Sequence, residues 1–204
     1  MTAEVEDRRV RKTRKALIDA FSDIVLVRRY EDIRIGEILE QADVGRSTFY
    51  SHFLGKDDLL TRSMDWMLNV LASMAAPEPD MSAVRFLLQH IWENRERGRT
   101  ILNGQPGAVV MRALSLKLES GLDETCARRG HTPPIALRFV ANQIAASQFA
   151  LLQTWIAGEA SCSVEALATA MHKTVFAMVS TTVLDADFPS SALTSPPNRP
   201  NALG

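Results

Sequence analysis

Apolar residues recur along this chain at spacings of three and four positions, and sustained strand-type alternation is absent. In the first such segment, residues 11–28, the apolar side chains fall on one helical face: Leu17, Ala20, Phe21, Ile24 and Val25. The same periodicity predicts helices over residues 35–41, 46–53, 57–75, 81–97, 108–129, 134–157 and 163–184. The pattern therefore predicts an all-α protein of about nine helices, in which the Gly-, Asn- and Pro-rich residues 98–107 form a connection.

Two of the predicted helices, residues 35–41 and 46–53, are short and joined by a tight turn that contains Asp43, Val44 and Gly45. So short a link forces a steep crossing between the helices, which is the helix-turn-helix arrangement. Asp tolerates the left-handed conformation of a tight turn, and Gly is an acceptable N-cap. The pattern thus predicts a helix-turn-helix over about residues 34–53, with Phe49 and Phe53 as the buried pair of its second helix.

The run VGRSTFYSHFLGKDDLL, residues 44–60, resembles the DNA-binding core of the tetracycline-repressor (TetR, AcrR-type) family of bacterial regulators. The preceding IRIGEILEQAD, residues 33–43, is similar to the helix that supports this core in the family. Asp43 stands where the family usually has Gly, Gly45 where it usually has Ser, and Arg34 where a Thr or Ser cap is common. Asp43 and Gly45 are both conformationally tolerable, so we expect slightly altered capping and an intact motif.

The resemblance implies a DNA-binding domain over residues 8–56, followed by a helical dimerisation and effector-binding domain over residues 57–187. The segment from Pro77 to Pro79 is the clearest internal break in the second domain. Residues 188–204 are rich in Pro, Ser and Asn, a composition typical of a disordered tail.

A helix that lies in the major groove of DNA presents its N-terminal side chains to the base edges. Arg46, Ser47 and Thr48 occupy that position, and Arg can pair bidentately with guanine. The alternative for Arg46 is a merely solvent-exposed cation.

Residues one or two helical turns later are expected at phosphate oxygens, and these are Tyr50, His52 and Lys56. The family resemblance implies that Tyr50 and Lys56 clamp the DNA backbone. Arg34 is a further candidate for a phosphate contact, whereas His52 is either a backbone contact or a packing residue.

Six positive charges lie within eight residues, without an acid among them: Arg8, Arg9, Arg11, Lys12, Arg14 and Lys15. Such a run is either a solvated face or an attachment site for phosphates, whose condensed counterions are released on binding. Beside a helix-turn-helix, we expect it to contact the DNA backbone or minor groove, with Arg11 among the contacting residues.

The helix predicted around residues 135–156 is apolar on more than one face, which suits packing against both its own core and a second subunit. The last helix is its natural companion. The predicted interface residues are Phe139, Ala146, Phe149, Gln153, Trp155, Met171, Val175 and Met178. The resemblance implies a homodimer with a four-helix interface, bound to a pseudo-palindromic double-stranded operator with reading helices about 34–36 Å apart.

The resemblance implies that the helices after residue 57 surround an effector pocket, and a lining of Met and aromatic residues suits a small apolar or aromatic effector. The candidates are Met67, Leu71, Phe86, His90, Trp92, Met111 and Leu114. The same spacing is also typical of an ordinary core, in which His90 needs a polar partner. The resulting hypothesis is a repressor released from its operator by a small molecule. The alternative is a regulator whose C-terminal domain docks a protein partner; a cavity favours the first and an exposed apolar patch the second.

Catalytic, metal and cofactor motifs are absent from the sequence. The four histidines, His52, His90, His131 and His172, are scattered, without an HExxH pair, a Gly-rich phosphate loop or a nucleophile elbow. We therefore expect a protein that is not an enzyme and needs no cofactor.

The most apolar segment, residues 135–156, contains Arg138 and several amide side chains, so we expect no membrane span. The charged N-terminus does not resemble a signal peptide, and Cys126 and Cys162 have neither metal-ligand nor disulfide-framework spacing. These features predict a cytoplasmic protein, and the family resemblance implies a bacterial one.

Overall fold

The computed structural model describes residues 2–184, without the side chains of residues 2–7 and Leu26. This part of the chain is all-α, as predicted, and contains ten α-helices and one 3-10 helix. Their bounds are α1 Thr2–Val27, η1 Tyr30–Asp32, α2 Ile35–Ala42, α3 Arg46–Tyr50, α4 Lys56–Ser63, α5 Asp65–Ser73, α6 Met81–Glu93, α7 Arg95–Leu102, α8 Gly104–Arg129, α9 Leu137–Ala157 and α10 Val164–Thr182. The tail predicted to be disordered, residues 188–204, lies outside the described residues.

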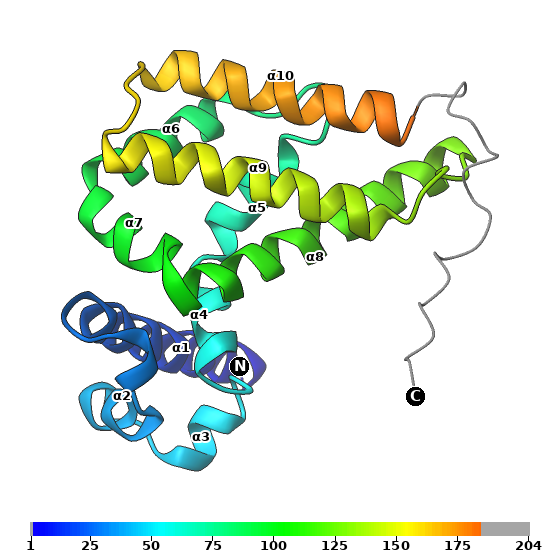
Figure 1. Ribbon diagram of the computed structural model, residues 1–204. Coiled ribbons are helices and arrows are strands. Elements are labelled where there is room, and N and C mark those ends of the chain that lie inside the picture. Colours follow the sequence, from blue (N-terminus) through cyan, green and yellow to red (C-terminus); the bar gives the residue numbers. More distant parts are fainter. Residues whose placement is uncertain (1, 185–204) are drawn as a thin grey trace, which may run out of the picture.

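Figure 1 shows a small unit of α1, α2 and α3, called the head below, beneath a larger layer of α5 to α10, called the body. Helix α4 joins them, because it packs against α1 of the head and α8 of the body. Helices α9 and α10 run antiparallel across the body, with α8 packed against α9.

The core of the head follows the predicted helical face of α1. Leu17, Phe21 and Val25 are buried, and they are joined in the core by Ile38 of α2 and Phe49 of α3. Two fully buried aromatic rings in so small a unit fix the orientation of α3, because interiors pack densely and tolerate little displacement.

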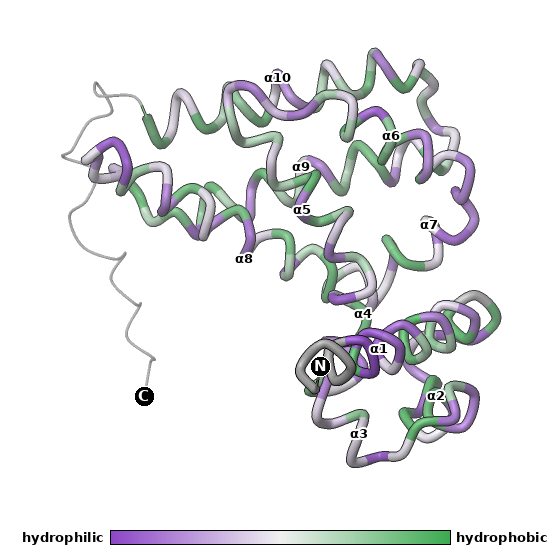
Figure 2. The backbone as a smooth tube through the Cα atoms, turned by 180° about the vertical axis from the view of Figure 1, so that it is seen from behind, coloured by the Kyte–Doolittle hydropathy of each residue, from purple (hydrophilic) through white to green (hydrophobic). Residues whose placement is uncertain are grey.

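Figure 2 shows long apolar stretches in α9 and predominantly hydrophilic residues in α7. No helix among residues 2–184 combines the length and the apolarity that crossing a membrane requires.

The region predicted as one helix over residues 57–75 is two helices, α4 and α5, separated at Met64. Met64 has φ −104° and ψ 7°, outside the helical range. The hydroxyls of Thr61 and Ser63 donate to carbonyl oxygens three residues earlier, which competes with the regular helical pattern. The prediction of a continuous helix was therefore wrong.

The predicted connection over residues 98–107 is also largely helical, since it contains most of α7 and the start of α8. Pro106 lies in the first turn of α8, where a missing N–H costs nothing because that group has no helical partner. Gly107 is required at this corner, because a Cβ atom there would lie 2.3 Å from the carbonyl oxygen of Leu102. Gly and Pro here mark a tight junction between two helices.

Candidate DNA-binding surface and internal cavity

The turn between α2 and α3 has the predicted chemistry. Asp43 ends α2 in the left-handed conformation, with φ 52° and ψ 47°, and among the described residues it is the one non-glycine with positive φ. The backbone N–H of Asp43 donates to the carbonyl oxygen of Glu40, and the N–H of Val44 donates to the carbonyl oxygen of Leu39. Gly45 is the N-cap of α3 in an extended conformation, and a Cβ there would meet Thr48 at an ordinary 3.9 Å. The departures from the family pattern are therefore accommodated.

Helix α3 presents its first residues to solvent from a rigid base. Phe49 is its one buried residue and lies 5.7 Å, centroid to centroid, from the ring of Phe53. Arg46, Ser47 and Thr48 are exposed, and within residues 2–184 their side chains make no hydrogen bond or ion pair. These three side chains are available to an external partner.

Tyr50 and His52 differ in exposure. Tyr50 is 49% exposed, with its ring edge against Phe49. His52 is half-buried beside Phe53, at 6.5 Å between ring centroids. Their contact with phosphate stays a prediction, and the packing alternative for His52 stays open.

Lys56 is held by the protein itself. Its ammonium donates to the carbonyl oxygens of Tyr30 at 2.5 Å and Ile33 at 3.1 Å, and lies 4.3 Å from the centre of the Tyr30 ring. A lysine ammonium has three N–H donors, so one is left for a phosphate. The sequence did not predict this structural role, in which Lys56 joins α4 to η1.

Tyr30 completes this junction. It is buried, its ring meets Phe21 edge-on, and its hydroxyl donates to Oδ1 of Asp57 at 2.5 Å. Burial, and then the hydrogen bond to Asp57, raises the pKa of Tyr30 far above its ordinary value of 10.0. A buried tyrosine hydroxyl needs a partner, but the partner lies 27 residues away and has no signal in the sequence.

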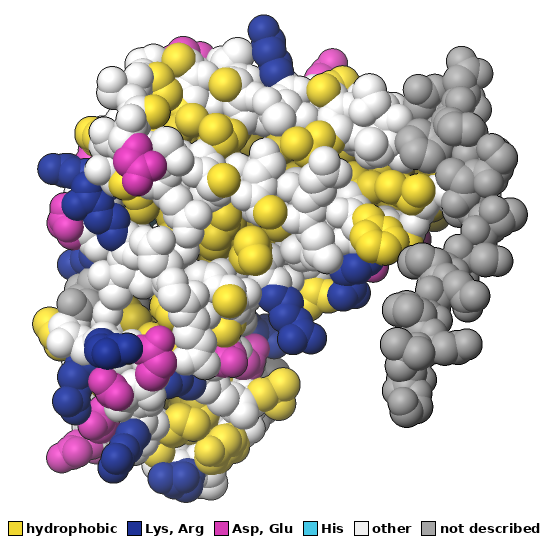
Figure 3. Space-filling model, in the orientation of Figure 1, with side chains coloured by type: hydrophobic (Ala, Val, Ile, Leu, Met, Phe, Trp, Pro, Cys, Tyr) yellow, Lys and Arg dark blue, Asp and Glu magenta, His cyan; other side chains and the backbone are white. Residues whose placement is uncertain are grey.

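The basic residues at the start of α1 lie beside the helix-turn-helix. Arg8, Arg11 and Lys12 are exposed, and the guanidinium of Arg14 lies 5.9 Å from the ring centre of Phe53. Arg34 is exposed at the N-cap of α2. Figure 3 shows Lys and Arg side chains concentrated over the head, interspersed with acids.

An apolar cavity of about 200 Å³ lies where the head meets the body. Its walls are formed by α1, α4, α5, α6, α7, α8 and α9, so the head and the body share it. The head contributes Phe21, Ser22 and Val25 of α1, while Phe149 and Leu152 of α9 lie in the walls contributed by the body.

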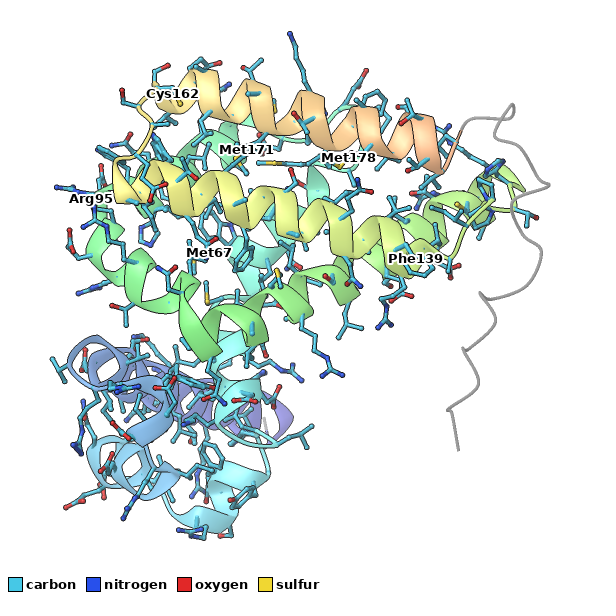
Figure 4. The ribbon with its side chains drawn as sticks, viewed as in Figure 1. Met67, Arg95, Phe139, Cys162, Met171 and Met178 are labelled. Carbon is cyan, nitrogen blue, oxygen red and sulfur yellow. The ribbon has the colours of Figure 1, made fainter. Side chains whose placement is uncertain are left out.

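The predicted effector residues divide into two groups. Met67, Leu71 and His90 line the cavity, with Met67 visible below α9 in Figure 4. His90 is exposed and lies at the edge of the cavity, although a buried imidazole was expected.

Phe86, Trp92, Met111 and Leu114 do not line the cavity. Phe86 is 65% exposed and packs edge-on against Trp66, 5.6 Å away, on the outer surface. The ring of Trp92 stacks with that of Trp155, with 4.8 Å between the ring centroids. Leu114 is fully buried in the core, and Met111 is half-buried and packs against this core.

The sequence did not reveal the wall of the cavity made by Asn94, Arg97, Gly98, Ile101 and Leu102. Asn94 and Arg97 lie within the helix predicted over residues 81–97 but were not assigned to the pocket, and Gly98, Ile101 and Leu102 lie in the predicted connection over residues 98–107. Helix α7 spans the boundary between the two, and Gly98, Gly104 and Pro106 obscured its helical spacing.

The residues predicted for the dimer interface also fall into two groups, those packed inside the subunit and those on its surface. Phe149, Trp155, Met171 and Val175 are at most 4% exposed and pack inside the subunit, so their assignment to a dimer surface was wrong. The reason is that α9 and α10 are apolar on their inner faces too, and periodicity does not distinguish core from interface. Gln153 is also engaged within the subunit, since its Nε2 donates to the Leu102 carbonyl at 2.7 Å.

The outward face of α9 and α10 consists mostly of small, uncharged residues: Asn142, Ala146, Ala150, Ala157, Ala166, Ala170, Thr174 and Ala177. Phe139, at one end, is 71% exposed, and Met178 is half-buried. These two helices contain only three acidic or Lys/Arg residues, Arg138, Glu165 and Lys173. Figures 3 and 4 show this face turned to the viewer, with Met171 and Met178 between the helices.

Comparison with known proteins agrees with this architecture. No protein-family model matches the chain. A segment of 55 residues is 42% identical to the uncharacterized HTH-type transcriptional regulator YxbF of Bacillus subtilis (strain 168). This match covers 26% of the present chain and only 14% of the relative.

Among solved structures, a TetR transcriptional regulator from Streptococcus agalactiae 2603V superposes with a TM-score of 0.53 and 23% identity, over 85% of this chain and 98% of that one. The dihydroxyacetone kinase operon activator DhaS gives a TM-score of 0.47 and 21% identity, over 84% and 98% of the two chains. The chain thus has the fold of TetR-family transcriptional regulators. The resemblance found in residues 44–60 is confirmed at the level of the fold.

Proposed function

We propose that this protein is a TetR-like transcriptional regulator that binds operator DNA as a homodimer and responds to a small molecule. The observation that carries the first part is α3, whose leading side chains Arg46, Ser47 and Thr48 project from a rigid aromatic base and have no partner within the described part of the chain. In this role they contact base edges in the major groove, whereas Tyr50, Arg34 and the basic turns of α1 hold phosphates.

Binding to DNA is tested by fluorescence anisotropy of a labelled duplex over a range of salt concentrations. Each phosphate contact contributes about −0.9 to the slope of log K against log[salt]. Lys12→Ala, at an exposed residue of the basic turns, should therefore make the slope less negative by about 0.9. Arg95→Ala is the matched control, because Arg95 lies over Trp92 on the outer edge of the body. Equal slopes for wild type and Lys12→Ala would remove these turns from the DNA-binding surface.

The outward face of α9 and α10 supports the homodimer. Small residues allow close approach of two helical pairs, and a nearly uncharged surface avoids the cost of burying unpaired charges. Pairing about a two-fold axis that runs from the body toward the head would place the two heads on one side of the dimer, as a pseudo-palindromic operator requires.

The dimer is tested by light scattering coupled to gel filtration. Ala150→Glu introduces a charge at an exposed position in the middle of α9, and we expect it to give monomers of unchanged helical content. Gln89→Glu is the control, because Gln89 is exposed on α6, which packs behind α10. A dimer that persists in Ala150→Glu would place the interface elsewhere.

The cavity supports a small-molecule effector over a docked protein partner. A ligand inside it touches Phe21 and Val25 of the head and Phe149 of the body simultaneously, so its presence changes the packing between the two. A ligand that fits the cavity better in one head orientation shifts the population toward that orientation. In a dimer, this alters the separation of the reading helices and weakens operator binding.

A further inference from the structure

One wall of the cavity is polar. His90 of α6, Asn94 at the break between α6 and α7, and Arg97 of α7 all line the same cavity. The amide of Asn94 is 3.4 Å from Nδ1 of His90 and also donates to the His90 carbonyl at 2.9 Å. The other residues that line the cavity are apolar, apart from Gly98 and two serines, Ser22 and Ser63.

Arg97 is the charged residue of this wall and is exposed at the edge of the cavity, and no acidic residue lines the cavity among the described residues. The three neighbouring arginines of α7 differ in their contacts. Arg95 lies over the Trp92 ring, and Arg99 donates to the Ile156 carbonyl at 2.9 Å and to Glu96 at 3.0 Å. Arg97 has neither a hydrogen bond nor an ion pair within residues 2–184.

The hydroxyls of the two serines are already used as donors. Ser22 donates to the Ile18 carbonyl at 2.8 Å, and Ser63 donates to the Leu60 carbonyl at 2.7 Å. The side-chain groups that remain for a ligand are therefore the guanidinium of Arg97, the imidazole of His90 and the amide of Asn94. A guanidinium without a counter-charge pairs best with a carboxylate, which it binds through two parallel hydrogen bonds.

The volume limits the apolar part of the ligand. An apolar protein cavity of about 150 Å³ is known to hold a benzene molecule. The cavity of about 200 Å³ seen here therefore suits roughly one substituted ring or a chain of about eight carbons.

We propose that the cavity binds a small organic acid whose apolar body fills the space between α1, α5 and α9 and whose carboxylate pairs with Arg97. This inference rests on the proposed function in taking the cavity as the effector site, and it specifies the chemical class of the effector. The carboxylate lies against α7, and the apolar body lies against Phe21 and Val25 of α1.

The test uses two pairs of probes that match in size and differ in charge: octanoate with 1-octanol, and phenylacetate with 2-phenylethanol. Binding to the full-length protein is measured by isothermal titration calorimetry without DNA. In at least one pair, the acid should bind about tenfold more tightly than the alcohol, as expected for a charge-assisted bidentate contact.

Arg97→Gln should reduce the affinity for that acid about tenfold and leave the affinity for the alcohol unchanged. Arg95→Gln, two residues away and facing Trp92, is the matched control and should leave both affinities unchanged. Met67→Trp, which fills the cavity from α5, should abolish binding of both probes, with circular dichroism to verify the fold.

The inference is overturned if neither acid binds more tightly than its alcohol, if Arg97→Gln binds the acid as wild type does, or if Met67→Trp still binds it. If acid and alcohol bind equally well at the cavity, the effector is not a carboxylate. The proposal of a regulator that responds to a small molecule is not contradicted by that result. A separate anisotropy titration with operator DNA tests the function itself. An acid that binds through Arg97 without weakening DNA binding supports the site and rejects its proposed regulatory role.

Discussion

The junction of Tyr30 with Asp57 allows a quantitative prediction. Tyr30→Phe keeps the buried ring against Phe21 and removes the hydroxyl that donates to Asp57 at 2.5 Å. Hydrogen bonds to charged groups contribute about 1.5–3 kcal/mol. Because Asp57 is exposed and water can replace the phenol as its donor, the low end applies. We expect the free energy of unfolding to fall by about 1.5 kcal/mol at neutral pH.

The assay is urea denaturation followed by circular dichroism, at one fixed protein concentration. The second tyrosine of the chain is the control, because Tyr50 is half-exposed and its hydroxyl makes no hydrogen bond within the described residues. Tyr50→Phe should change the unfolding free energy by less than about 0.5 kcal/mol.

The raised pKa of Tyr30 adds a pH dependence of known sign. The unfolded chain loses the Tyr30 proton near the ordinary pKa of 10.0, whereas the folded protein keeps it. The stabilisation from the neutral phenol is therefore complete below about pH 10 and decreases above it, by about 1.4 kcal/mol per pH unit. All other titratable groups are the same in the two proteins, so the difference between wild type and Tyr30→Phe isolates Tyr30. A difference that stays constant from about pH 9 to pH 11 would refute the role given to this hydroxyl.

Three further predictions concern the backbone and core, each measured by the same denaturation assay. Gly107→Ala should destabilise the protein by about 1–3 kcal/mol, because its Cβ would lie 2.3 Å from the Leu102 carbonyl oxygen. Gly121→Ala, on the same helix with open space around it, should instead stabilise by up to about 1 kcal/mol. Asp43→Gly should stabilise by about 0.5–1 kcal/mol and Asp43→Val should destabilise, because residue 43 has a left-handed conformation; equal stability of the two variants would contradict this. Gln148→Met should change stability by less than about 1 kcal/mol, because it removes a buried Oε1 atom that has no partner among the described residues and also the Nε2 group that donates to the Leu71 carbonyl at 3.0 Å; a loss of about 2 kcal/mol or more would contradict this.

The helix-turn-helix could be predicted from the sequence because its structure depends on residues that are close together in the chain. The buried face of α1, the left-handed Asp43, the Gly45 cap and the buried Phe49 follow from periodicity and turn chemistry, which involve residues close in sequence. For the same reason, the family resemblance was visible in an unbroken run of residues.

Features that depend on distant contacts were not predictable in this way. Phe149 and Trp155 were assigned to a dimer surface because both faces of α9 are apolar, and only the packed structure shows which face is internal. The contact between Tyr30 and Asp57 joins residues 27 positions apart. Arg97 lies within the helix predicted over residues 81–97, but its place in the cavity depends on how α7 packs against α1, α8 and α9, which local spacing does not give. Gly and Pro at the junction of α7 and α8 are typical of a loop, although here they permit a sharp corner.

The central claim, that α3 reads DNA sequence, is tested most directly by selecting bound duplexes from a random DNA pool with the full-length protein. The selected sequence is then titrated with wild type and Arg46→Ala, beside a scrambled duplex. The expected result is a pseudo-palindrome with half-sites about 34–36 Å apart, which Arg46→Ala binds about 1–3 kcal/mol more weakly while its affinity for scrambled DNA changes little. Failure to enrich any sequence, or equal affinity of wild type for selected and scrambled DNA, would contradict the claim.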